Sequence, residues 1–245
     1  MKDMRPMGRM WHLYKMGGIT PAVASMFGAQ NAQQMAFIRS IMKEQRKNEM
    51  YEMELRQLDA VVFDLETTGF SPYNGDEIIS IGAVAMVGGE LVPEQSFHSL
   101  VNPKRDIPPN IEVLTGITSE SAAEAPGLIT VLHDFFNFVN KRILVCHGSG
   151  HDKHFLNSAL WKTSKVHLSH RMLDCMIISK WLHPMRKEID LDSLLSAYNI
   201  EVTRRHDALE DSVMTGQLWS KMIDEIEDKE VHTLGDLYSQ LSNIG

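Results

Sequence analysis

The alternation of apolar and polar positions predicts a chain in which three strands come first and strands then alternate with helices. Residues 60–66 (AVVFDLE), 77–89 and 90–101 are apolar, β-prone runs, and Gly88-Gly89 predicts a hairpin turn between the last two. Two further strands are expected within 142–147 and 166–175. Hairpin-linked strands followed by strand–helix alternation indicate an α/β layer fold with a mixed sheet.

Helical patterns occupy much of the remaining chain. We expect helices over 126–140, 152–161, 176–184, about 190–198, 207–226 and 234–242. Residues 31–57 lack Pro and Gly and predict one more helix, with Met35, Ile38 and Met42 on one face. Residues 1–30 mix Met, Gly and Pro, which predicts weak order. We therefore divide the chain into a Met-rich, basic, partly helical extension (1–58), a main domain (59–226) and a C-terminal helix (227–245).

Charge is distributed unevenly along the 245 residues. Residues 1–58 carry a formal net charge of +4 and residues 59–245 carry −12, which together give −8. The acidic main domain argues against broad electrostatic binding of duplex nucleic acid, which needs many phosphate contacts. It leaves open a small cleft in which bound cations supply the positive charge.

Localisation signals are few. No apolar run reaches the length of a membrane span, and the basic N-terminus lacks a continuous apolar core, so we expect neither a membrane anchor nor a secretory signal. Cys146 and Cys175 give no disulfide framework and fit the reducing cytoplasm as buried small side chains. We therefore expect a cytoplasmic protein.

The first strand carries two acids within an apolar run, at Asp64 and Glu66. Alternate strand residues point to the same face, so both carboxylates are expected side by side. Burying two like charges without a partner is costly, and a divalent cation such as Mg²⁺ would relieve the repulsion. The alternative is a strand end at which both acids simply reach water.

Two more acids fall on apolar helix faces. Asp152 shares its face with Phe155, Leu156, Ala159 and Leu160, although an Asp at the start of a helix is also a favoured N-cap. Asp211 lies within about 20° of the directions of Leu218 and Met222 at about 100° per residue, so it is expected to point inward. The preference of acids for the first turn of a helix does not explain an inward one.

These four carboxylates suggest a site for two divalent ions. His206 precedes Asp211 by five residues. A single His is usually structural, but one this close to an expected metal ligand is a candidate general base because its pKa lies near neutral pH.

Several stretches together resemble the DnaQ-like (DEDDh) 3′–5′ exonucleases, which include the proofreading exonuclease of bacterial DNA polymerase III. DLETTG (64–69) resembles the first motif of this family, VCHGSGHDKHFL the second with its Asp at Asp152, and HDALEDS (206–212) the third. DEIISIGAV, LTGIT, LDCMIISKWLHP and DLDSLLSAYNI resemble the segments between them. The resemblance spans about residues 59–226 and implies a ribonuclease H-like fold with a central mixed five-stranded sheet flanked by helices.

The resemblance also implies a mechanism. Two Mg²⁺ or Mn²⁺ ions would be held by Asp64, Glu66, Asp152 and Asp211, with Asp64 bridging them, and His206 would accept the proton of the attacking water. The expected reaction removes 5′-mononucleotides from the 3′ end of single-stranded nucleic acid, with DNA favoured. Thr67, Thr68 and Gly69 would lie near the terminal nucleotide, or form only a turn. His147 is either a further substrate contact or a core residue.

Two residues depart from the family pattern, and alternatives stay open for the substrate, for catalysis and for residues 31–57. Gly148 stands where the second motif commonly has Asn, and Asp207 where the third commonly has Arg. An RNA-trimming exoribonuclease or oligoribonuclease is an alternative, because 2′-hydroxyl recognition depends on the shape of the cleft. A non-catalytic module that binds nucleic acid or a polymerase is another. Residues 31–57 either recruit a polymerase or other protein partner, or pack on their own domain.

Overall fold

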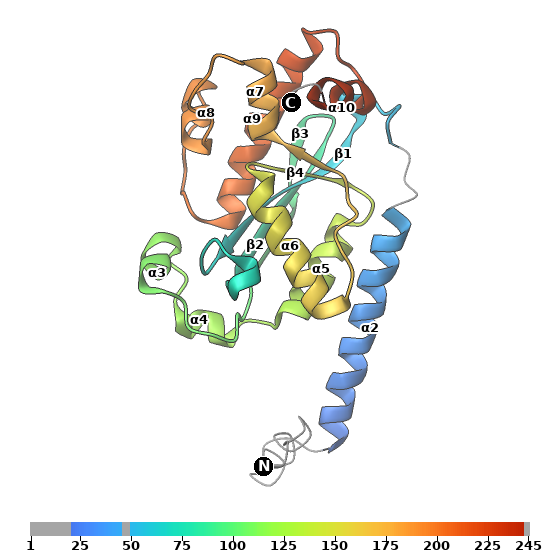
Figure 1. The fold of residues 1–245 in the computed structure, drawn as a ribbon, viewed down its shortest axis with the longest axis vertical. Helices are drawn as coiled ribbons and strands as arrows, with labels where there is room; N and C mark the ends of the chain where they lie inside the picture. The colour runs from blue at the N-terminus through green and yellow to red at the C-terminus, as the bar shows by residue number, and fades with distance from the viewer. Residues whose placement is uncertain (1–20, 46–49, 243–245) are drawn as a thin grey trace.

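A mixed five-stranded sheet forms the centre of the molecule. The computed structural model describes residues 21–45 and 50–242, and its side chains from residue 28 onward. The strands are β1 (Asp59–Thr67), β2 (Ile78–Val87), β3 (Glu90–Leu100), β4 (Ile143–Cys146) and β5 (Met172–Asp174), in the spatial order β3-β2-β1-β4-β5 (Figure 1). Strands β1, β2 and β3 pair antiparallel, whereas β4 is parallel to β1 and β5 is parallel to β4.

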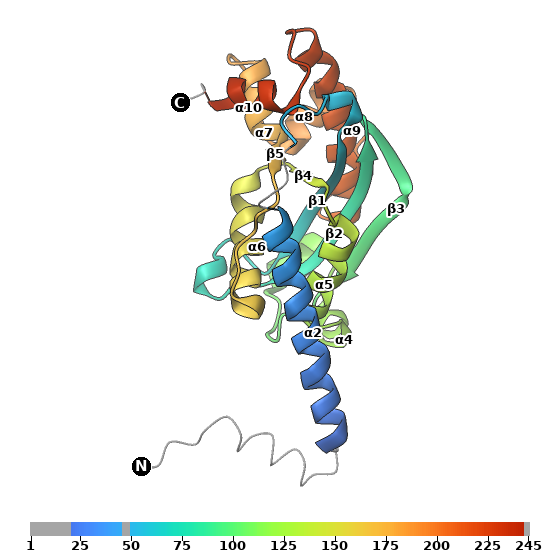
Figure 2. The same ribbon diagram turned by 90° about the vertical axis from the view of Figure 1, so that its right-hand side faces the viewer.

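Helices cover both faces of the sheet, because the strands are apolar on both sides. Ala60 and Val62 of β1 pack in a cluster with α7 (Cys175–Leu182), α8 (Leu191–Ala197), α9 (Ala208–Glu227) and α10 (Leu234–Ser242). Val61 and Phe63 face the other way, toward α2 (Pro21–Gln45), α5 (Leu128–Val139) and α6 (Ser149–Ser164). The two groups of helices lie on opposite sides of the sheet (Figure 2). This arrangement confirms the expected five-stranded α/β fold.

Most of the predicted elements are present. Gly88 and Gly89 both have positive φ, 59° and 88°, as a two-residue hairpin turn between right-twisted strands requires. The helix predicted to begin at Asp152 begins at Ser149, so Asp152 lies within its first turn. Three short elements were not predicted: the 3₁₀ helix η2 (Pro72–Asn74) and the helices α3 (Pro109–Thr115) and α4 (Ser119–Glu124).

The helix predicted over 31–57 is only partly correct. α2 begins at Pro21, within the stretch expected to be weakly ordered, and ends at Gln45. Beyond residues 46–49, which are outside the described residues, the chain turns at Tyr51 and Glu52 and then forms the 3₁₀ helix η1 (Leu55–Gln57). Glu54 forms an isolated bridge with Thr233, so tertiary pairing overrides the helical propensity of this stretch. Residues 1–20 also lie outside the described part of the chain.

The second half of α2 packs on the domain itself. Ile38 and Met42 are fully buried against the cluster that contains α5 and α6, as the shared face predicted. Arg39 donates through Nε to the carbonyl oxygen of Ser164 at 2.8 Å, and Gln45 donates to that of Asn140 at 2.9 Å. In contrast, residues 28–33 are exposed and α2 projects beyond the body of the molecule there (Figures 1 and 2). Among the described residues, no helix is both long and apolar enough to cross a bilayer.

Candidate active site

The two acids of β1 lie side by side on the face that packs against α9. Because side chains alternate along a strand, Asp64 and Glu66 share the face of Ala60 and Val62. Glu66 is 8% exposed, so it does not simply reach water at the strand end. Asp64 pairs with Gly82 of β2, which has no side chain to stand between β2 and the start of α9.

Asp211 reaches the same place from α9. It is 3% exposed, in agreement with the inward direction expected from helical periodicity. Asp207 is the N-cap of α9, where its carboxylate accepts hydrogen bonds from the backbone N–H groups of Leu209 and Glu210. The Asp found where the family commonly has Arg therefore fixes the start of the helix that presents Asp211.

Asp152 comes from the first turn of α6 and is 4% exposed. It is not the N-cap, because that position is taken by Gly148 with φ 78°. A left-handed residue favours Gly and, next, Asn, which accounts for Gly148 in place of the common Asn. Asp174 holds this turn in place, since its carboxylate accepts hydrogen bonds from the backbone N–H groups of Gly148 at 3.0 Å and Ser149 at 2.7 Å.

The four carboxylates interact strongly with one another. Burial raises the pKa of Asp64 well above its usual range, and the carboxylates of Asp152, Glu66 and Asp211 raise it further. Burial, followed by repulsion from Asp211, raises the pKa of Glu66 to about 7. The pKa values of Asp152 and Asp211 are also raised, chiefly by burial. The fold thus concentrates negative charge that a cation would neutralise.

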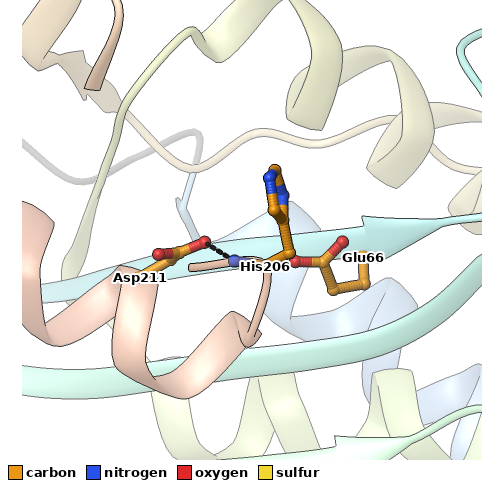
Figure 3. A group of neighbouring side chains, drawn as sticks. All are labelled: Glu66, His206 and Asp211. Carbon is orange, nitrogen blue, oxygen red and sulfur yellow. Dashed lines mark hydrogen bonds between the residues drawn. The ribbon is translucent and has the colours of Figure 1, made fainter. Parts of the chain in front are cut away.

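Glu66, His206 and Asp211 form the tightest group of possible metal ligands among the described residues. One ligand atom from each lies within 4.8 Å of the others. Figure 3 shows Glu66 and Asp211 on either side of the His206 backbone. His206 has a φ of 60°, in the left-handed region, and its backbone N–H donates to Asp211 Oδ2 at 3.0 Å. Such strained backbone is frequent at functional sites because surrounding contacts hold it in place.

A cleft of about 350 Å³ opens over these groups. Of the residues expected in the site, seven line it: Asp64, Glu66, Thr67, Gly69, His147, His206 and Asp211. Asp152 is not part of the lining, although it lies close enough to raise the pKa of Asp64. Thr68 is also outside the lining: its hydroxyl donates to Asp76 at 3.1 Å and accepts from the backbone N–H of Glu77. The Nδ1 atom of His147 is buried without a hydrogen-bond partner.

The cleft has further wall residues that were not among the predicted site residues, and Arg205 is the most informative of them. Its guanidinium pairs with Asp211 Oδ1 and donates through Nε to Asp192 at 2.6 Å. Phe70, Leu114, Thr115 and His151 also line the cleft. Leu114, Thr115 and His151 belong to the stretches LTGIT and VCHGSGHDKHFL, so the sequence indicated their segments without giving these residues a role. Phe70 is marked only by its unusual exposure of 84%, which requires the structure.

Comparisons with known proteins agree with this geometry. The exonuclease family model of the RNase T type matches residues 61–219. The PolC-type DNA polymerase III of Clostridium perfringens is 36% identical over 188 residues, which cover 75% of this chain but only 13% of that relative. The chain thus spans a small part of the curated relatives it matches.

Solved structures support the fold. The nuclease domain of 3′hExo, a DEDDh family member bound to rAMP, has a TM-score of 0.60 at 21% identity, covering 68% of this chain and 92% of that one. Exonuclease X in complex with 5′ overhanging duplex DNA has a TM-score of 0.58 at 20% identity, covering 74% and 99%. With a family model that matches more than half of its residues and motifs of the DEDDh group in order, the chain belongs to the DnaQ-like exonuclease family and is a nuclease.

Proposed function

We propose that the protein is a 3′–5′ exonuclease that depends on two divalent metal ions and removes 5′-mononucleotides from single-stranded nucleic acid, with DNA favoured. The observation that carries this proposal is that Asp64, Glu66 and Asp211 meet beside His206 in one cleft. Asp152 of α6 lies close behind them, near enough to act on Asp64. Assigning this activity to residues 59–226 is part of the same proposal.

The donor set fits hard divalent cations such as Mg²⁺ or Mn²⁺. Carboxylate oxygens are the ligands these ions prefer. Burial, and then repulsion from the carboxylates of Asp152, Glu66 and Asp211, raises the pKa of Asp64, and a bound cation would oppose both effects. Asp64, Glu66, Asp152 and Asp211 would hold the ions. When bound, they would supply the positive charge that makes water a nucleophile near neutral pH and stabilises the phosphate and the leaving oxygen.

His206 is suited to accept a proton from the attacking water. It lines the cleft, and its ligand atom lies within 4.8 Å of those of Glu66 and Asp211. The hydrogen bond from its backbone N–H to Asp211 holds its backbone in place, so its ring is attached to a rigid backbone. If His206 is the base, His206→Gln should lower kcat by about 10²- to 10⁴-fold. An unchanged kcat would remove His206 from this role.

The terminal nucleotide would lie among Thr67, Gly69, His147 and Leu114. Thr67 donates to the carbonyl oxygen of Gly69 at 2.7 Å, which fixes the turn after β1. The unpartnered Nδ1 of His147 supports a polar contact with substrate, because buried polar atoms normally have a partner. Thr68 would help to shape this turn.

RNA is the second candidate substrate, because the similar 3′hExo domain is described as bound to rAMP. A panel of single-stranded DNA, mismatched primer, short RNA and structured RNA, each labelled at either end, would establish both substrate and polarity. Products that shorten from the 5′ end would contradict the proposal. Preference for RNA would keep the mechanism and replace the substrate.

The roles of the acids can be tested by isosteric substitution. We expect Asp64→Asn and Asp211→Asn to abolish cleavage in Mg²⁺ or Mn²⁺ and to weaken binding of Mn²⁺ measured by calorimetry. Glu94→Gln is the matched control, since Glu94 is an exposed acid of β3. Cleavage by the purified Asp variants at the unmodified rate would overturn the assignment.

A polymerase or other protein partner recruited through residues 31–57 is also a proposal. Ile38 and Met42 are used by the protein's own core, so a partner would contact the exposed side of α2, which includes Lys43. A cytoplasmic location, where such nucleic acid substrates occur, belongs to the same proposal. Co-purification of a partner with the full chain, and its loss when the exposed side of α2 is altered, would support it.

A further inference from the structure

Two aromatic side chains beside the cleft are almost uncovered. Phe70 is 84% exposed and Tyr73 is 68% exposed. Both lie in the turn that follows β1, and Tyr73 belongs to η2. Large aromatic side chains left in water close to a site often serve to bind a ligand, because their burial is favourable and their faces can stack.

These side chains border a second pocket of about 430 Å³. Its walls include Phe70, Pro72, Tyr73, Gly150, His151 and His154. Phe70 and His151 also line the cleft over the carboxylates, so the two spaces are neighbours that share a wall. A polymeric ligand whose end lies in the cleft could continue directly into the second pocket.

The walls of the second pocket carry two aromatic pairs. Phe70 and His151 meet edge to face with ring centroids 5.8 Å apart, and Tyr73 and His154 do so at 5.9 Å. His151 and His154 are three residues apart on α6, so the pairs are about one helical turn apart. The Tyr73 hydroxyl also lies 3.3 Å from His154 Nδ1.

The turn that carries Tyr73 is fixed in position. Ser158 of α6 donates through its hydroxyl to the carbonyl oxygen of Pro72 at 3.2 Å. The carboxylate of Asp76 accepts from the backbone N–H of Ser71 at 3.0 Å and from the hydroxyl of Thr68 at 3.1 Å. The aromatic rings therefore stand on a preorganised support, which reduces the entropy lost when a ligand binds.

One cationic side chain accompanies these rings. Lys153 of α6 is exposed next to His154. Exposed aromatic side chains together with a cation are a combination with which proteins bind single-stranded nucleic acid without reading its sequence.

We propose that the second pocket binds the base immediately 5′ of the nucleotide being removed, by stacking it against Tyr73 and His154. This rests on the proposed exonuclease function, because that function places the 3′ end in the adjoining cleft. Every base has an aromatic face, so the pocket holds the strand independently of sequence. The site would favour single strands, whose bases are free to separate from one another.

The proposal predicts that variants of this pocket lose activity mainly on substrates that have an upstream base. We compare Tyr73→Ala, Tyr73→Phe and His154→Ala on an oligothymidylate and on the p-nitrophenyl ester of thymidine 5′-phosphate, which has no upstream nucleotide. Tyr73→Ala should raise KM for the oligonucleotide about tenfold and reduce kcat/KM far less on the ester. Tyr73→Phe keeps the ring and should therefore retain most of the activity on the oligonucleotide that Tyr73→Ala loses. Trp161→Ala is the control, since Trp161 is an exposed aromatic residue of the same helix outside the pocket.

A binding assay separates this proposal from the proposed function. Anisotropy of a 5′-labelled oligothymidylate, measured in EDTA, should give a Kd about tenfold higher for Tyr73→Ala than for the unmodified protein. If the unmodified protein cuts neither substrate but Tyr73→Ala still weakens binding, the exonuclease assignment fails and the aromatic site stands. Equal binding by both proteins, equal losses on both substrates, or no binding at all would overturn the aromatic site.

Discussion

Gly82 of β2 lies directly against Ala208, the first residue of α9. A Cβ atom at Gly82 would overlap the backbone of Ala208 and Leu209. Gly82 is also the register partner of Asp64, so this close approach of α9 to the sheet occurs beside that acid. This contact determines how near the start of α9, and therefore Asp211, comes to β1.

Gly82→Ala should damage the site through this contact. The added methyl group has to push α9 away from β2, which we expect to cost about 1–3 kcal/mol of stability and to reduce kcat about a hundredfold by misplacing Asp211. Thermal unfolding and single-strand cleavage measure the two effects. Gly127→Ala is the control, since nothing lies within 4 Å of a Cβ there. Normal activity in Gly82→Ala would show that the spacing of α9 does not control the site.

Arg205 is expected to compete with divalent ions for Asp211. Its guanidinium pairs with Asp211 Oδ1, one of the oxygens that an ion would need. Arg205→Gln should therefore bind Mn²⁺ several-fold more tightly by calorimetry and lose about 1–3 kcal/mol of stability in EDTA. Arg204→Gln is the matched control because Arg204 pairs with Asp207, whose carboxylate caps α9. Unchanged affinity in Arg205→Gln would exclude competition.

Glu66 should make the metal-free protein less stable as pH rises. The pKa of Glu66 is raised from 4.5 to about 7, so the folded chain binds this proton more tightly than the unfolded chain. The resulting contribution to the free energy of unfolding is fully present below pH 4.5. It is lost as pH rises to about 7, for a change of about 3 kcal/mol. Thermal unfolding in EDTA of the unmodified protein and of Glu66→Gln gives the difference. Mg²⁺ should stabilise the unmodified protein most at the upper end of this window.

His170 should make the protein less stable as pH falls, which is the opposite of the effect of Glu66. Burial lowers the pKa of this residue from 6.5 to about 4. Its Nε2 lies 2.9 Å from the carbonyl oxygen of Asn140, and its ring stacks on Phe136. A His with a lowered pKa contributes stability that is present above pH 6.5 and lost as pH falls to about 4, again about 3 kcal/mol. The stability of His170→Gln should fall less toward acid pH than that of the unmodified protein. Parallel curves would show that His170 is solvated.

Ile38 tests whether α2 belongs to the core. The side chain is fully buried against α5 and α6. Truncation to Ala removes that packing and should lower the free energy of unfolding by about 2–4 kcal/mol in a urea titration. Ser40→Ala, at an exposed position of the same helix, should change it little. Equal stability of both variants would mean that α2 does not pack on the domain in solution.

The local pattern of the sequence determined the directions in which four acids point. Alternation along β1 placed Asp64 and Glu66 on one face, and helical periodicity turned Asp152 and Asp211 inward; all four directions agree with the structure. These inferences succeed because side-chain direction within a strand or helix depends on local geometry alone.

Only the tertiary structure decided which groups the acids meet. The pairing of β1 with β4, the contact of Gly82 with Ala208 and the ion pair of Arg205 with Asp211 join residues from separate elements or loops. Likewise, the end of α2 at Gln45 and the second pocket between η2 and α6 depend on packing between distant segments. Periodicity within one segment carries no information about its partner, because partners are selected by the burial and shape of the whole fold.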